Sequence, residues 1–115
     1  MLIAGICMTN FEINKRVAEK LGLMEYLFIA DDIGELIWNV PSNLNYNGLI
    51  SSRGNSLDFC DTANNAWTVI IDNKICLAFD VFEGDWVASP AYGESSDRVR
   101  DVKPFKAAMC VFLNT

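Results

Sequence analysis

The sequence predicts an α+β fold in which three helices pack against a mainly antiparallel sheet. Three segments with helical apolar spacing alternate along the chain with pairs of short apolar runs that are separated by turn residues. Ile75, Leu77, Phe79 and Val81 alternate with Cys76 and Ala78, and both sets are apolar, which is typical of a strand covered on both faces. We therefore expect a small α/β/α sandwich, with a two-layer arrangement as the alternative.

The first helix is predicted over residues 10–21. A capping box at its start pairs the Thr9 side chain with the Glu12 amide, and the Glu12 carboxylate with the Thr9 amide. Gly22 provides a left-handed stop at the other end. The predicted buried stripe repeats at every fourth residue and consists of Ile13, Val17 and Leu21.

A hairpin and a polar connection are predicted after this helix. The apolar runs at residues 26–30 and 36–40 are separated by an acidic turn, which favours a hairpin. Residues 41–58 are rich in Asn, Gly and Ser and are predicted as a connection, with a short strand near residues 49–51.

A second helix is predicted over residues 62–72, with Asp61 or Thr62 as its cap. Its apolar positions have the spacing of one buried stripe, namely Ala63, Ala66, Trp67, Ile70 and Ile71. A strand over residues 74–81 then turns at residues 82–85 into a second hairpin arm. From this hairpin we assign four residues to the core: Ile75, Leu77, Phe79 and Trp86.

A third helix is predicted over residues 104–113, after a polar loop at residues 90–101. Pro104 suits the first turn of a helix, where a missing N–H costs nothing. The core residues predicted on this helix are Phe105, Met109 and Phe112. Trp67 of the second helix is predicted as a core residue, and the alternative is an exposed binding anchor.

Composition and charge restrict the function. The chain has 115 residues, no histidine and a net charge of −6. The absence of histidine excludes Ser-His-Asp triads, Cys-His dyads and histidine metal sites, and the net charge disfavours binding to nucleic acid. No apolar run is long enough to cross a membrane, and the start of the chain lacks the features of a signal peptide. We therefore expect a single cytoplasmic domain over residues 1–115, in which residues 1–7 are an edge strand or an extension.

The cysteines are predicted to be buried free thiols, with structural disulfides or a metal as the alternatives. They are Cys7, Cys60, Cys76 and Cys110, and no two of them have the spacing of a redox motif or of paired zinc ligands. Cys76 and Cys110 lie in apolar runs, where a thiol behaves as a small buried hydrophobe. Unpaired thiols are typical of a reducing cytosol.

Clusters of charged residues are candidate binding sites in this sequence. Asp31, Asp32 and Glu35, and likewise Asp58 and Asp61, are explained best by turn and cap chemistry rather than by metal binding or acid–base catalysis. No P-loop, dinucleotide-binding or EF-hand pattern occurs, so we predict no catalytic residue, cofactor or metal. A solvated surface is favoured over a phosphate-binding face for the interleaved basic stretch Arg98, Arg100, Lys103 and Lys106.

Several blocks resemble a known family. Residues 11–22 contain Phe-Glu-Ile-Asn-Lys followed by Val-Ala and Leu-Gly, and residues 65–75 contain Asn-Ala-Trp, Ile-Ile and Asn-Lys-Ile. Residues 85–88 read Asp-Trp-Val-Ala, and residues 104–113 contain Pro, Ala-Ala-Met and Val-Phe-Leu. In this order the blocks resemble the NinX-like proteins of lambdoid phages and prophages over nearly the whole chain from Met8.

The resemblance has departures and limited functional content. Thr68 stands where the family usually has proline, Lys103 stands where it has asparagine, and residues 1–7 are extra. The family implies a phage accessory protein with a helix–sheet–helix sandwich and no established activity. Together with the absence of a catalytic motif, this favours a non-enzymatic module that binds a host or phage protein. The alternative is a nucleic-acid-binding protein that uses the stretch from Arg98 to Lys106.

Overall fold

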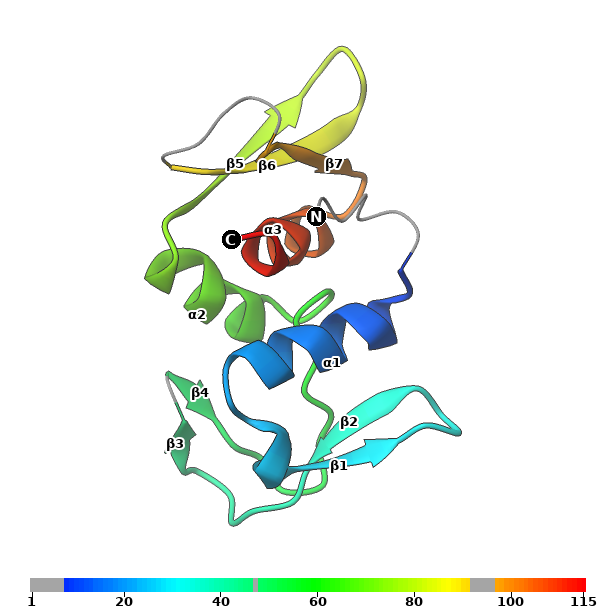
Figure 1. Ribbon diagram of the computed structural model, residues 1–115, viewed down its shortest axis with the longest axis vertical. Coiled ribbons are helices and arrows are strands. Elements are labelled where there is room, and N and C mark those ends of the chain that lie inside the picture. The colour runs from blue at the N-terminus through cyan, green and yellow to red at the C-terminus, as the bar shows by residue number, and fades with distance from the viewer. Residues whose placement is uncertain (1–7, 47, 92–96) are drawn as a thin grey trace.

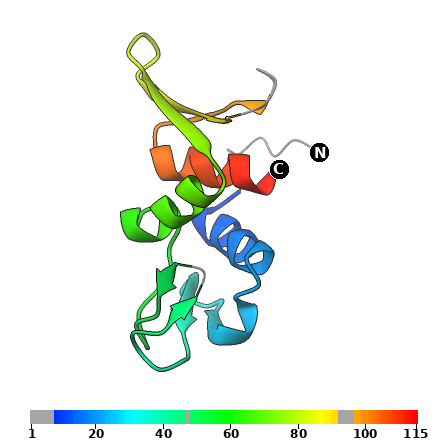
Figure 2. The same ribbon diagram turned by 90° about the vertical axis from the view of Figure 1, so that its left-hand side faces the viewer.

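Three helices occupy the middle of an elongated molecule, and strands lie at both of its ends (Figures 1 and 2). The computed structural model describes residues 8–46, 48–91 and 97–115, so the expected strand or extension at residues 1–7 lies outside the described residues. The helices are α1 (Asn10–Lys20), α2 (Ala63–Asp72) and α3 (Pro104–Leu113). Their positions confirm the predicted helices. Thr9 caps α1 as predicted, since its hydroxyl accepts a hydrogen bond from the Glu12 amide at 3.2 Å.

The strands form three small antiparallel sheets. They are β1 (Leu27–Ala30) with β2 (Glu35–Trp38), β3 (Asn45–Tyr46) with β4 (Leu49–Ile50), and β5 (Ile75–Asp80), β6 (Asp85–Pro90) and β7 (Val99–Asp101) in the order β5-β6-β7. The α+β class, the helices and both predicted hairpins are thereby confirmed. Strand β7 was missed, because its residues belong to a segment predicted as a polar loop.

The layer order differs from the expected sandwich. The helices lie between separate sheets instead of covering both faces of one sheet (Figure 1). Helix α3 packs against one face of the β5-β6-β7 sheet, whereas Cys76 and Ala78 on the other face are exposed. The prediction that residues 75–81 are covered on both faces is therefore wrong. An apolar pattern in a strand indicates only which side chains tolerate burial. In the described structure β5 is an edge strand, and no helix covers the face of the sheet opposite α3.

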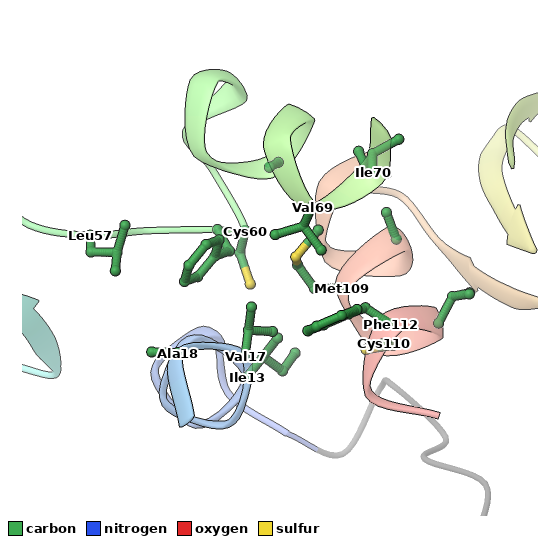
Figure 3. Packing of buried hydrophobic residues seen from close by; sticks show 14 of the residues in the cluster. Ile13, Val17, Ala18, Leu57, Cys60, Val69, Ile70, Met109, Cys110 and Phe112 are labelled. Atoms are coloured by element: carbon green, nitrogen blue, oxygen red, sulfur yellow. The ribbon is translucent and has the colours of Figure 1, made fainter. Parts of the chain in front are cut away.

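The core is formed where the three helices meet (Figure 3). The predicted core residues that are fully or nearly fully buried are Ile13, Val17, Ile70, Ile75, Met109 and Phe112. Those that are half-buried are Leu21, Leu77, Trp86 and Phe105. Burial of Lys20 lowers the pKa of its ammonium, which donates to the Phe112 carbonyl at 2.6 Å and so satisfies the end of α3.

Four residues predicted for the core or for the buried stripe of α2 are exposed instead, among them Ala63 at the start of α2. Trp67 is 46% exposed, Ile71 is 62% exposed and Phe79 is 50% exposed. Helix α2 has two neighbouring apolar stripes with the same spacing, and it buries the one formed by Ala66, Val69 and Ile70. Trp67 lies at the margin, where its ring meets the edge of Phe105 at a centroid distance of 6.1 Å.

An unpredicted part of the core comes from the connection between β4 and α2. Leu57, Phe59 and Cys60 are almost completely buried. The buried Asn14 side chain of α1 holds this segment, because its Oδ1 accepts from the Phe59 amide at 2.9 Å and its Nδ2 donates to Asp58 Oδ1 at 3.1 Å. The connection was predicted to be polar, and the two apolar residues Leu57 and Phe59 were too few to indicate burial.

Candidate functional site

The predicted basic stretch is neutralised at two of its four positions. The Arg100 guanidinium pairs with Asp85 at 2.9 Å and with Asp80 at 2.5 Å, and the Lys103 ammonium pairs with Asp61 at 3.2 Å. The hydrogen bond from Arg100, together with two backbone amides, lowers the pKa of Asp80. Arg98 is exposed and Lys106 is half-buried. These four residues therefore present less positive charge than the sequence alone indicates.

The predicted carboxylate clusters have structural partners or lie in a turn. Asp58 Oδ1 accepts from the amides of Cys60 and Asp61, which is the turn chemistry expected for it. Asp31 and Asp32 lie exposed in the turn between β1 and β2. Within residues 8–46, 48–91 and 97–115, no three Cys, Asp or Glu side chains gather in a way that would hold a metal ion.

The thiols differ in burial. Cys60, Cys76 and Cys110 are free, and Cys7 lies outside the described residues. Burial raises the pKa of Cys60 to about 12 and that of Cys110 to about 11, so both thiols stay protonated near neutral pH. Cys76 is exposed on the outer face of β5, so its predicted burial is wrong.

The most exposed large apolar side chain, Phe82, lies with Val81 at the turn between β5 and β6. Phe82 is 95% exposed and Val81 is 73% exposed, and the half-exposed Phe79 lies on the adjoining strand. We call residues 79–82 the hairpin tip. Single exposed apolar residues are ordinary, whereas a group of them on one protruding element marks an interaction surface. Figure 2 shows that this hairpin projects beyond the helices.

The turn holds the tip in a defined shape. Asp80 Oδ1 accepts from the Phe82 amide at 2.9 Å and from the Glu83 amide at 3.2 Å, and the Gly84 amide donates to the Asp80 carbonyl at 2.8 Å. Gly84 has a φ of +74°, which glycine adopts without strain. The ring of Phe79 meets the edge of Trp86 at a centroid distance of 5.3 Å. Phe82 is therefore presented by a braced turn.

A shallow hollow adjoins the tip on the outer face of the sheet. Its volume is about 450 Å³, and its lining includes Cys76, Ala78 and Val87, together with Arg98, Arg100 and the tip residues. The tip region carries the carboxylates of Asp80, Glu83 and Asp85, of which Asp80 and Asp85 share the Arg100 guanidinium. The surface beside the tip is thus apolar, with charged side chains of both signs at its margin. The sequence contained a signal for it, namely the large apolar residue Phe82 in the turn predicted over residues 82–85.

A second hollow, of about 600 Å³, lies between β4, residues 52–56 and the start of α2. Its lining is dominated by uncharged amides and hydroxyls, among them Asn55, Asn64 and Asn65. No ionisable side chain lines it, so among the described residues it contains no group for acid–base catalysis.

No family model, curated protein or solved structure matches this chain. No helix in the described part of the chain is both long and apolar enough to cross a membrane. The resemblance to NinX-like proteins therefore stays a prediction from the sequence, and the hairpin tip is the candidate site that the geometry offers.

Proposed function

We propose that this protein is a non-enzymatic phage or prophage accessory protein that binds another protein, of the host or of the phage, through the hairpin tip. The observation that carries the proposal is the exposure of Phe82 and Val81 on a braced turn. Burying a large apolar side chain contributes roughly 1.5–3 kcal/mol to association. The non-enzymatic role rests on the sequence, which has no histidine and no catalytic motif.

The chemistry of the tip favours one kind of partner surface. Phe82 and Val81 fit an apolar pocket, and the exposed Glu83 carboxylate fits a basic residue at the rim of that pocket. The net charge of −6 favours the same choice, because it attracts a basic partner at long range. We place the protein in the cytoplasm of the bacterial host, and the free thiols of Cys60, Cys76 and Cys110 support a reducing compartment.

A photo-crosslinker tests this proposal in cells. Benzoylphenylalanine at position 82 replaces a side chain that is already aromatic and exposed, so the fold is expected to persist. The matched control carries the same residue at Ile33, which is 60% exposed in the turn of the other hairpin. We expect position 82 to yield one dominant protein adduct, identified by mass spectrometry, that position 33 does not yield. Adding Val81→Ser to the position 82 variant should reduce the yield of that adduct.

Two results would contradict the proposal. One is an adduct pattern at position 82 that matches the pattern at position 33. The other is an affinity for DNA or RNA that falls steeply with salt and disappears on Arg98→Glu and Arg100→Glu substitution, which would favour the nucleic-acid alternative. The pairing of Arg100 and Lys103 with carboxylates supports protein binding over that alternative.

A further inference from the structure

The outer edge of β5 carries backbone groups that no other described segment binds. Pro90 lies opposite Ile75 in the β5–β6 register. Since proline has no N–H, this is a non-hydrogen-bonded pair, and the Ala91 amide accordingly donates to the Lys74 carbonyl at 3.1 Å. Bonded and non-bonded pairs alternate along an antiparallel ladder. The residues whose N–H and C=O groups point away from β6 are therefore Ile75, Leu77 and Phe79.

Between Lys74 and Asp80, and as far as the described residues go, this edge lacks the features that usually protect an edge strand. Proteins block free edges with lysine, proline, a bulge or a covering segment. Residues 75–79 are all apolar, and their register with β6 runs without a bulge. Figure 2 views the molecule from this side, with β5 in front of β6 and β7. Such an edge is suited to pairing with a further strand.

We propose that the partner at this edge is a second copy of this chain, whose β5 pairs antiparallel in a register centred on Leu77. In this register Leu77 faces Leu77 of the second copy, and Ile75 faces Phe79 of the second copy. Every outward backbone group of both strands then finds a partner. A register centred on Cys76 leaves Phe79 without a strand residue opposite it, and one centred on Ala78 does the same to Ile75.

The side chains of β5 are self-complementary in this register. Cys76 faces Ala78 of the second copy in a non-hydrogen-bonded pair, where the strands approach most closely and small side chains fit. On the opposite face, the half-exposed Phe79 gains the apolar side chain of Ile75 as its neighbour across the pair. At the ends, Lys74 of one copy comes near Asp80 of the other, so opposite charges meet.

The pairing has a consequence for the hairpin tip. Because the two strands run antiparallel, the two tips lie at opposite ends of the joined sheet. A dimer thus displays two copies of the binding surface, which raises the avidity for a repeated partner. This consequence rests on the proposed function, whereas the pairing itself rests only on the edge of β5.

Amide hydrogen exchange tests the pairing residue by residue. In the monomer, the amides of Cys76 and Ala78 are bonded to β6, and those of Ile75, Leu77 and Phe79 face solvent. We expect the second group to become at least about tenfold more protected between micromolar and millimolar protein concentrations, while the first group stays protected throughout. Sedimentation equilibrium should show a dimer over the same range. A monomer at millimolar concentration, with the second group exchanging freely, would overturn the proposal.

Two matched variants test whether the dimer forms through the edge of β5 or through the outer face of the sheet. Ala78→Lys places a charge on the edge strand, and Val87→Lys places the same charge opposite it on the central strand β6. Both side chains lie on the outer face, so both variants should fold. We expect Ala78→Lys to weaken dimerisation at least about tenfold and Val87→Lys to change it less than about threefold. Equal effects of the two variants would contradict pairing at the edge.

The outcome distinguishes this inference from the proposed function. A monomeric protein that still crosslinks a partner through position 82 would retain the proposed function and exclude the dimer. A dimer that yields no specific adduct at position 82 would retain the pairing of β5 and contradict the proposed function. In a Cys7→Ser background, Ala78→Cys adds a direct check, because oxidation should join Cys76 of one copy to position 78 of the other as a covalent dimer.

Discussion

Strands β2 and β5 are both mostly apolar, but of their edges only that of β2 is covered by another described segment. The Trp38 amide donates to the Asn55 carbonyl at 3.0 Å, and the Gly54 amide donates to the Trp38 carbonyl at 3.0 Å. The Leu57 amide donates to the Leu36 carbonyl at 2.8 Å. Along β5, no described segment forms a corresponding set of bonds beyond β6.

The difference lies in the segment that comes after each hairpin along the chain. After β2, the connection to α2 folds back along the strand and is anchored by the buried side chains of Leu57 and Phe59. After β6, the chain continues into β7, which pairs on the side of β6 away from β5. Whether a strand edge is covered therefore depends on a segment elsewhere in the chain and on the residues that anchor it. For β2 we call this segment, residues 54–59, the cover, and mutation of its anchors tests their contribution.

The largest expected effect is at Phe59. Phe59→Ala removes a completely buried ring from the covering segment and should lower the free energy of unfolding by about 3–5 kcal/mol. Phe82→Ala removes the same ring from the hairpin tip and should change stability by about 0.5 kcal/mol or less. Urea denaturation of the two variants measures both values. Equal losses would mean that the tip is packed and would contradict its role as an exposed surface.

The next largest loss of stability is expected from removing the hydrogen bonds by which Asn14 holds the segment that covers β2. Asn14→Ala leaves the buried Phe59 amide without its acceptor, which should cost about 1–3 kcal/mol. Faster exchange of the Leu57 amide should accompany the loss, because that amide binds β2. Asn64→Ala, at an exposed position of α2, is the control and should be nearly neutral. A fully protected Leu57 amide in Asn14→Ala would show that the side chains of Leu57 and Phe59 hold the cover alone.

Local patterns in the sequence predicted the elements of the fold well. The capping box at Thr9 and Glu12 and the four-residue spacing from Ile13 located α1, and Pro104 located the start of α3. These signals act within a few residues, so one sequence suffices to find them. The polar connection hid the anchors Leu57 and Phe59, because the segment contacts elements far away in the sequence, such as Asn14, which binds the Phe59 amide.

The candidate site could be predicted less well, for a related reason. Apolar residues in β5 indicate that a surface avoids water, but they do not say whether the same chain or another one covers it. Phe79 and Trp67 were therefore assigned to the core, although both are about half exposed. The pairing of Arg100 with Asp80 and Asp85 depends on the β5-β6-β7 register, which spacing in the sequence does not encode.

A comparison of two tryptophans tests the difference between exposed and buried apolar rings, with a smaller expected loss of stability. Trp67→Ala removes a half-exposed ring and its edge contact with Phe105, so we expect a loss of about 1 kcal/mol instead of the loss typical of a buried ring. Trp38→Ala, in the covered strand β2, is the buried counterpart and should lose several times more. The denaturation midpoints of both variants provide the measurement. A Trp67→Ala loss as large as that of Trp38→Ala would restore the core assignment of Trp67.

The smallest expected effect concerns the charges beside the open strand. Asp80→Asn keeps the acceptor for the Phe82 and Glu83 amides but removes the charge that pairs with Arg100. Because the pKa of Asp80 is lowered in the folded protein, its stabilising effect is present above the ordinary value of 3.8 and is lost as the pH falls through the folded value. We expect Asp80→Asn to melt slightly below the wild type at pH 7, by less than Trp67→Ala does, and the gap to close as the pH falls through the lowered pKa of Asp80. Asp31→Asn, in the exposed turn of the other hairpin, is the control and should melt with the wild type at pH 7. A gap for Asp80→Asn that persisted at low pH would indicate that the amide perturbs the turn itself, so that the shape of the hairpin tip and not its charge had changed.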